Sequence, residues 1–238
     1  MNMKTESLGS LDKLEASESA DKPPGVGRVV ALTLALWFGL VLLLGIRGAF
    51  VGAPDSPPLP IFFGFAAPLA VFFAAYFGWS TFRSFILGAD LRLVAAIQAW
   101  RWAGLGFLSL YAYGVLPGLF AFPAGLGDMA VGVTAPWIVL GLVRHPSFAT
   151  SRRFAIWNIM GILDLAVAVS LGTLCSGFFH GFNGNITTSS MARLPLVLIP
   201  AYMVPLFIML HFTALAQARQ LARSGKCAPD KTPEPVNR

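Results

Sequence analysis

The sequence predicts an all-α, polytopic membrane protein, a bundle of six transmembrane helices. Of its 238 residues, 56% are hydrophobic and only 12% are charged, whereas a soluble domain has about 25% charged residues. This shortage of charge leaves too little polar surface to face water, so much of the outer surface must contact lipid. The length accommodates one compact bundle and no second domain of ordinary size.

Six long hydrophobic segments account for most of the chain. Each is close to the roughly 20 residues that a helix needs to cross a hydrocarbon core about 30 Å thick. The shortest connection contains Pro117-Gly118 and the Phe122–Gly125 stretch, which together predict a tight, uncharged hairpin. We expect transmembrane helices over about 29–46, 61–81, 94–116, 120–143, 154–175 and 194–216.

The ends of the chain are polar. Residues 1–27 mix acidic and basic side chains, and residues 218–238 are basic and contain several prolines. Segments of low hydrophobicity and high charge cannot bury enough apolar surface to fold alone. We therefore expect a disordered cytoplasmic tail over 1–27, the bundle over 28–217 and a second disordered cytoplasmic tail over 218–238.

The basic residues predict the orientation, because cytoplasmic loops of membrane proteins carry an excess of Lys and Arg. Fourteen of the 17 Lys and Arg residues lie in the two tails or in the connections after the second and fourth segments. Arg47 and Arg193 are the basic residues of the remaining connections, and Arg101 lies within the third segment. Both termini are therefore predicted to be cytoplasmic, and an even number of spans agrees with this because it places both termini on the same side.

Several function classes are disfavoured. The formal net charge is +6, but no basic stripe is interleaved with aromatic residues outside the spans, so we expect no nucleic-acid partner. The sequence has no Gly-rich phosphate loop, Ser/His/Asp constellation or Cys-x-x-Cys pair, which predicts that the protein is not an enzyme. Of the 3 histidines only His211 falls within a span, so we predict no metal site and no cofactor.

Polar residues inside the spans are the candidate functional residues, because a polar group in lipid is costly and usually marks a site. Asp128 and Asp164 are the only acidic residues within the hydrophobic segments. Their positions put them roughly 12 and 15 Å from the segment ends, near the middle of the membrane. The candidate intramembrane polar site comprises Arg101, Asp128, Asn158, Asp164 and His211.

The two aspartates lie in similar sequences. Gly125–Val133 and Gly161–Val169 match at five of nine positions. In both, Gly and Ala share a helical stripe with the aspartate, and small residues let helices approach closely. We therefore expect both carboxylates to face the bundle interior, with Arg101 as counter-ion. The stripes are Gly125, Asp128, Gly132 and Ala135, and Trp157, Gly161, Asp164, Ala168 and Gly172.

Three interpretations of the aspartates remain open. They accept hydrogen bonds that fix helix packing, they handle protons or cations during transport, or they form a metal or haem site with His211. Two inverted copies of one motif near the membrane midplane are typical of transporters, but the first three spans show no wider match to the last three.

The stretches Gln98–Arg101, Phe122–Asp128, Trp157–Asp164 and Leu210-His211 resemble those of small multi-span inner-membrane proteins of proteobacteria, a group of uncharacterised proteins. The resemblance covers roughly residues 94–216. It implies a multi-pass protein of the bacterial inner membrane and no particular biochemical activity. It also implies that the five residues of the candidate site belong together, although it assigns no role to any of them.

The leading hypothesis is a small proton- or ion-coupled transporter that uses Asp128 and Asp164, with the lipid bilayer and a small solute or ion as its partners. The competing hypothesis is a non-catalytic scaffold or accessory subunit of a membrane protein partner, in which the buried polar groups serve packing alone. A haem- or metal-binding membrane protein is the third.

Overall fold

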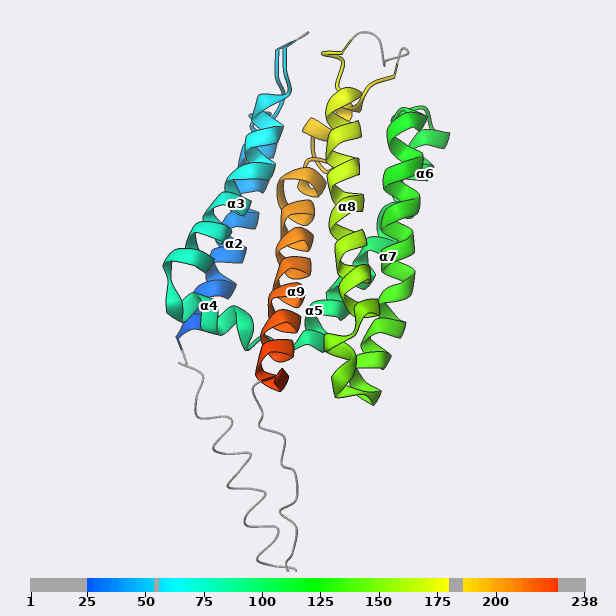
Figure 1. The fold of residues 1–238 in the computed structure, drawn as a ribbon. Helices are drawn as coiled ribbons and strands as arrows, with labels where there is room; N and C mark the ends of the chain where they lie inside the picture. The colour runs from blue at the N-terminus through cyan, green and yellow to red at the C-terminus, as the bar shows by residue number, and fades with distance from the viewer. Residues whose placement is uncertain (1–24, 54–55, 180–185, 227–238) are drawn as a thin grey trace, which may run out of the picture. The chain divides into compact units, whose positions relative to one another are not determined.

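The computed structural model describes residues 25–53, 56–179 and 186–226, and the regular secondary structure within these ranges is helical (Figure 1). The predicted tails over 1–24 and 227–238, and His180, lie outside the described residues. The chain divides into two units at Trp37 and Phe38, within the first helix. The packing described below lies within the second unit.

Six helices are long enough and apolar enough to cross a membrane, so the predicted number of spans is confirmed. The helices indicate a multi-pass membrane protein. They are Val26–Ile46 (α2), Leu59–Gly78 (α3), Leu91–Ala112 (α5, η1 and α6 in succession), Gly118–Arg144 (α7), Arg152–Leu174 (α8) and Ile199–Ser224 (η4 and most of α9).

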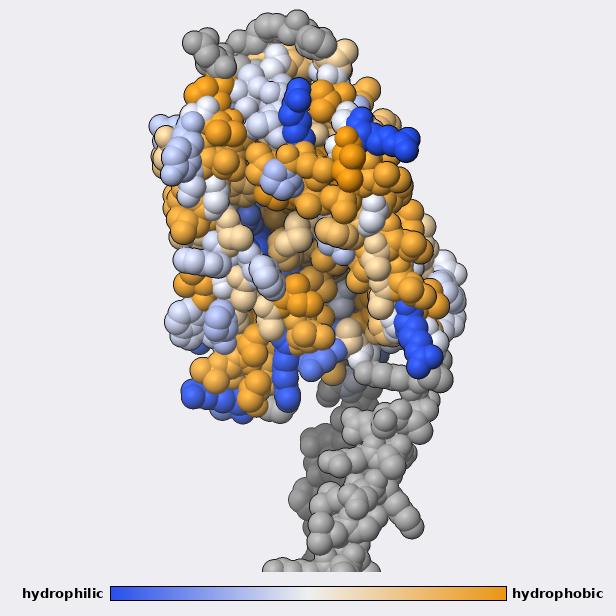
Figure 2. All heavy atoms as spheres, turned by 180° about the vertical axis from the view of Figure 1, so that it is seen from behind, coloured by the Kyte–Doolittle hydropathy of each residue, from blue (hydrophilic) through white to orange (hydrophobic). Residues whose placement is uncertain are grey.

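The outside of the molecule is largely apolar. The face shown in Figure 2 is mostly hydrophobic, and its protruding strongly hydrophilic side chains lie toward the two ends. Phe63 and Val71 on α3 and Trp137 on α7 are each more than 60% exposed. Phe72 is the only buried residue of α3. A helix that exposes apolar residues around most of its circumference is stable in lipid and not in water.

The third span is interrupted where a continuous helix over 94–116 is predicted. It consists of α5 (Leu91–Ile97), the 3-10 helix η1 (Gln98–Gly104) and α6 (Leu105–Ala112). η1 packs against α7 so closely that a Cβ atom added to Gly132 would overlap the backbone nitrogen of Trp102. Gly104 and Gly125 meet in the same way, with a Cβ on Gly104 placed 2.8 Å from the Gly125 carbonyl oxygen. These glycines allow the contact between the two backbones.

The hairpin between the third and fourth spans is shorter than predicted. Gly114 has a φ of 68°, in the left-handed region, and Pro117 precedes the first residue of α7. The predicted second half of the hairpin, Phe122–Gly125, is instead helical and belongs to α7, with Pro123 inside it. That part of the prediction is wrong, because a membrane helix tolerates a proline that its neighbours accommodate.

The sixth span begins later and ends later than predicted. Its first turn is a π-helix, η4 (Ile199–Met203), and α9 (Val204–Lys226) follows directly. Residues 218–226, predicted as part of a tail, are therefore helical. Gln217 anchors this extension, because its buried amide nitrogen donates to the carbonyl oxygens of Ile86 and Ala89 at 2.7 and 3.0 Å. These acceptors lie at the end of the short helix α4 (Ser80–Leu87).

Helices α7, α8 and α9 lie side by side and, with α5 and η1, enclose the polar centre of the protein (Figure 1). Apolar clusters lie on either side of this centre along the helices. One contains Phe154, Leu142 and Val94, and the other contains Phe120, Leu116 and Cys175. The polar residues are thus confined between two apolar layers.

We predict that Gly132→Ala destabilises the protein by about 1–3 kcal/mol, the usual cost of overpacking a filled core. The added methyl group would push η1 away from α7 and displace Arg101 with it. The measurement is the thermal unfolding midpoint in detergent. Gly106→Ala is the matched control, since an added Cβ there has nothing within 4 Å, and it should not lower the midpoint. Equal midpoints for the two variants would contradict the prediction.

Candidate functional site

Arg101 lies at the centre of the protein, with 1% of its surface exposed. It extends from η1 toward α7, α8 and α9. A guanidinium group is always charged in proteins and has five N–H donors, so its burial requires acceptors on several sides. The surrounding helices supply four recorded acceptors, two of which are carboxylates.

Both aspartates bind Arg101. The Nε atom of Arg101 donates to Asp128 Oδ1 at 2.7 Å, and its NH2 nitrogen donates to Asp164 Oδ2. The carboxylates come from α7 and α8 respectively, and their side chains are 15% and 16% exposed, whereas that of Arg101 is 0% exposed. One guanidinium thus joins the middle of α7 to the middle of α8.

The other terminal nitrogen of Arg101 reaches α8 and α9. NH1 donates to the Gly161 carbonyl oxygen at 3.2 Å and lies 3.0 Å from His211 Nε2. Because arginine can only donate, His211 Nε2 must accept. The proton of the neutral ring then lies on Nδ1, which is 2.9 Å from Asn158 Oδ1. Asn158 Nδ2 donates in turn to the Phe154 carbonyl oxygen at 2.9 Å, so every step of this chain has one donor and one acceptor.

Glycines leave the space that this network occupies. A Cβ atom on Gly161 would overlap the His211 ring, and one on Gly127 would overlap the Asp164 carboxylate. A Cβ on Gly104 would lie 2.5 Å from the Cβ of Asp128. The glycines of α7 and α8 thus leave room for polar side chains and also let neighbouring helix backbones approach closely.

Aromatic and amide groups surround the network. The Trp157 ring packs edge-on against His211, with 5.4 Å between centroids, and its indole nitrogen donates to Thr134 Oγ1 at 2.9 Å. The guanidinium carbon of Arg101 lies 5.9 Å from the centroid of the Phe207 ring. Gln98, one turn before Arg101, donates to the Phe207 carbonyl oxygen at 3.3 Å, and its own oxygen is buried without a partner among the described residues.

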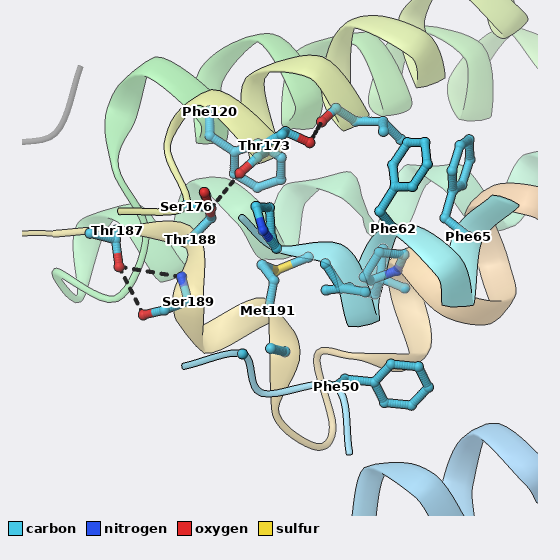
Figure 3. Close-up of a pocket in the computed structure, with 18 of the residues that line it drawn as sticks. Phe50, Phe62, Phe65, Phe120, Thr173, Ser176, Thr187, Thr188, Ser189 and Met191 are labelled. Carbon is cyan, nitrogen blue, oxygen red and sulfur yellow. Dashed lines mark hydrogen bonds between the residues drawn. The ribbon is translucent and has the colours of Figure 1, made fainter. Parts of the chain in front are cut away.

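A cavity of about 430 Å³ adjoins the network (Figure 3). Its lining on α8 runs from Leu165 to Thr173, roughly 12 Å of helix, and continues to the 3-10 helix η3 (Thr188–Ala192). Phenylalanines of α3 and α7 form much of the wall, and hydroxyl groups gather at the end near η3. The labelled side chains are Phe50, Phe62, Phe65, Phe120, Thr173, Ser176, Thr187, Thr188, Ser189 and Met191.

Asp128 belongs to both the network and the cavity. It is the one acidic residue in the described lining. Its Oδ1 atom accepts from Arg101, and no hydrogen bond to its Oδ2 atom is recorded among the described residues. Asp164 binds the same guanidinium but does not line the cavity. Of the two carboxylates that bind Arg101, Asp128 is therefore the one that lines the cavity.

The structure brings all five residues of the candidate site into one connected network. Sequence reasoning did not single out Gly127, Thr134 or the cavity. The role of Gly127 could have been predicted, because it adjoins Asp128 within a glycine-rich stretch. The cavity could not, since its lining comes from segments as distant in sequence as Phe50 and Val204.

The network does not present a ready metal or haem ligand. Both ring nitrogens of His211 are engaged, one by Arg101 and one by Asn158. Within residues 25–53, 56–179 and 186–226, no group of three His, Cys, Asp or Glu residues is arranged to hold a metal ion. The occupied ring nitrogens disfavour the interpretation of His211 as an axial ligand.

Fold and site together define a multi-pass α-helical membrane protein with an ionic network buried in its spans. A family model described as a domain of unknown function, DUF8737, matches residues 58–219. The match covers more than half of the chain and contains all five candidate residues, so the chain belongs to this family. Comparisons with curated proteins and with solved structures gave no match.

We predict that Arg101→Gln lowers stability by about 3–5 kcal/mol, because it leaves two carboxylates buried without their counter-ion. The thermal midpoint in detergent should fall strongly, whereas Arg92→Gln, at an exposed position, should leave it unchanged. Adding Asp164→Asn to Arg101→Gln should restore part of the loss, since one uncompensated charge is removed. A double variant less stable than Arg101→Gln alone would contradict this account of the network.

Proposed function

We propose that the protein is a small proton-coupled transporter of the bacterial inner membrane, in which Asp128 exchanges a proton or a cation with the cavity. The observation that carries the proposal is the position of Asp128, which ends the cavity and also pairs with the buried Arg101. Intramembrane carboxylates that reach a cavity and pair with a basic residue are typical of proton relays.

The charges of the network support exchange. Arg101 contributes one positive charge against two carboxylates, and His211, which accepts from Arg101 and donates to Asn158, is neutral. One negative charge therefore remains to be balanced in a low-dielectric interior, where an unpaired charge is costly. A proton or a bound cation balances it, and Asp128 is the carboxylate that either can reach from the cavity.

Through Arg101, the exchange of a proton or cation at Asp128 can change how the helices pack. When Asp128 is neutralised, its attraction for Arg101 weakens and the pairing of Arg101 with Asp164 dominates. Arg101 lies on η1, and 3-10 segments within longer helices often mark hinges. In this proposal η1 shifts along α7 as Arg101 redistributes between the two carboxylates, which couples protonation to the shape of the cavity.

A structural role is the second candidate, and a specific observation favours it. Arg101 has bonds to three helices, and His211 and Asn158 are each bonded on both sides. Such a network fixes helix register without any transport. A purely structural network predicts lower abundance of the Asp128→Asn and Asp164→Asn variants. It also predicts no solute-dependent proton movement by the wild type, and this second result separates the two candidates.

The transport test uses the full chain in liposomes that contain a pH-sensitive dye. A protein-free extract of small molecules from the host cell is added, and proton movement is followed. We expect the wild type to move protons when the extract is added, Asp128→Asn to do so at least tenfold more slowly, and Asp90→Asn to match the wild type. Asp90 is an exposed N-cap of α5, and Asn caps helices equally well. A wild type no faster than empty liposomes would rule out coupled transport.

We also propose that both termini face the cytoplasm and that the cavity opens on the opposite side. The excess of basic residues in the tails and in two connections supports this orientation. In a Cys227→Ser background, Ser189→Cys at the cavity end should react with a membrane-impermeant maleimide added to whole spheroplasts. Ser224→Cys near the end of α9 should react only after lysis. The reverse pattern of labelling would overturn the orientation.

A further inference from the structure

We propose that the cavity binds a lipophilic monocation, a primary ammonium group attached to an apolar body, with the ammonium group at Asp128. This proposal rests on the proposed function in taking the cavity as the path of the solute, and it names the class of solute. It follows from three properties of the cavity: its apolar wall, the negative charge at one end and the hydroxyl groups at the other.

The wall selects an apolar body. Phe62 and Phe65 of α3 and Phe120 of α7 line the cavity in Figure 3. Phe107 adds a fourth ring, packed edge-on against Phe120 with 5.3 Å between centroids. The volume of about 430 Å³ falls within the range of about 300–1,000 Å³ that is usual for sites of small organic molecules. An inorganic cation would leave most of this apolar surface without a partner.

The end of the cavity at Asp128 favours a positively charged group. The Oδ2 atom of Asp128 has no recorded partner among the described residues, and the network sets two carboxylates against one guanidinium. An ammonium group would donate to this oxygen and balance the charge. Hydrogen bonds to charged groups are worth about 1.5–3 kcal/mol, which corresponds to about a ten- to hundredfold gain in affinity.

The basic residue at the opposite end attracts an anionic ligand only weakly. Arg193 lines the cavity there, but its side chain is exposed, so water and salt screen its charge. The side chain of Asp128 is only 15% exposed, so its charge is screened less. Ser176 Oγ, which is buried without a partner in the described structure, also lines the cavity and can hydrogen-bond to a polar substituent on the apolar body.

The test uses three probes with the same body: 4-phenylbutylamine, 4-phenylbutanol and 4-phenylbutyrate. Binding to the detergent-purified full chain is measured by calorimetry at pH 7. We expect the amine to bind at least tenfold more tightly than the alcohol, and the carboxylate to bind most weakly. Asp128→Asn should reduce amine affinity to that of the alcohol, whereas Asp90→Asn should leave all three affinities unchanged.

A second variant keeps the test valid if Asp128→Asn fails to fold. A Cβ on Gly172 would meet Phe120 at 3.5 Å, an ordinary contact, so Gly172→Leu can fill the cavity and leave the ionic network intact. It should abolish binding of the amine and the alcohol, whereas Ser170→Leu, at an exposed position of α8, should not.

Equal affinities for amine and alcohol, or amine binding that survives Gly172→Leu, would overturn the inference. Both results are independent of the proton-movement assay, because binding in detergent requires no transport. If the protein prefers the amine but moves no protons, the proposed function is refuted and the solute class is retained. Proton movement without preference for the amine would refute the solute class alone.

Discussion

The burial of Arg101 is the constraint on which the rest of the structure depends. A guanidinium with 1% exposure in a membrane-spanning protein cannot be solvated by lipid, so the surrounding helices must supply its acceptors. Those acceptors come from three helices: Asp128 on α7, Asp164 and the Gly161 carbonyl on α8, and His211 on α9. The register of these helices is therefore set by one side chain.

The same constraint explains the irregular third span. Arg101 must reach three helices from a backbone that lies directly against one of them, and Gly104, Gly125 and Gly132 permit that close approach. The tighter turn of a 3-10 helix places Gln98, Arg101 and Gly104 in one line along the segment, and all three are buried. The local departure from α-helix geometry thus aligns the residues that contact the bundle interior.

Much of this structure could be predicted from the sequence. The six spans follow from hydrophobic length, and the five polar residues stand out because each is costly in lipid. The 3-10 segment could not be predicted, because its residues are also compatible with an α-helix and only the contact with α7 decides between them. The role of Gln217 could not be predicted either, since its acceptors, Ile86 and Ala89, lie more than a hundred residues earlier in the chain.

The cavity was beyond sequence reasoning for a different reason. Hydrophobic periodicity predicts which face of a helix is buried, but it does not predict where buried faces fail to meet. Nothing in the sequence distinguishes Phe62 and Phe120 from ordinary core or lipid-facing residues, but in the folded protein both line the cavity.

The structure also separates two aspartates that look alike in sequence. Both follow the same small-residue pattern and both bind Arg101, but Asp128 lines the cavity and Asp164 packs its Oδ1 atom against Gly127. In the proposed function, a cation in the cavity therefore meets Asp128, and Asp164 shares the guanidinium to which Asp128 is bound. The three residues thus form a row of ion pairs that begins at the cavity with Asp128 and continues through Arg101 to Asp164. The proposed transport role uses this difference between the two aspartates, whereas a role in packing alone does not depend on it.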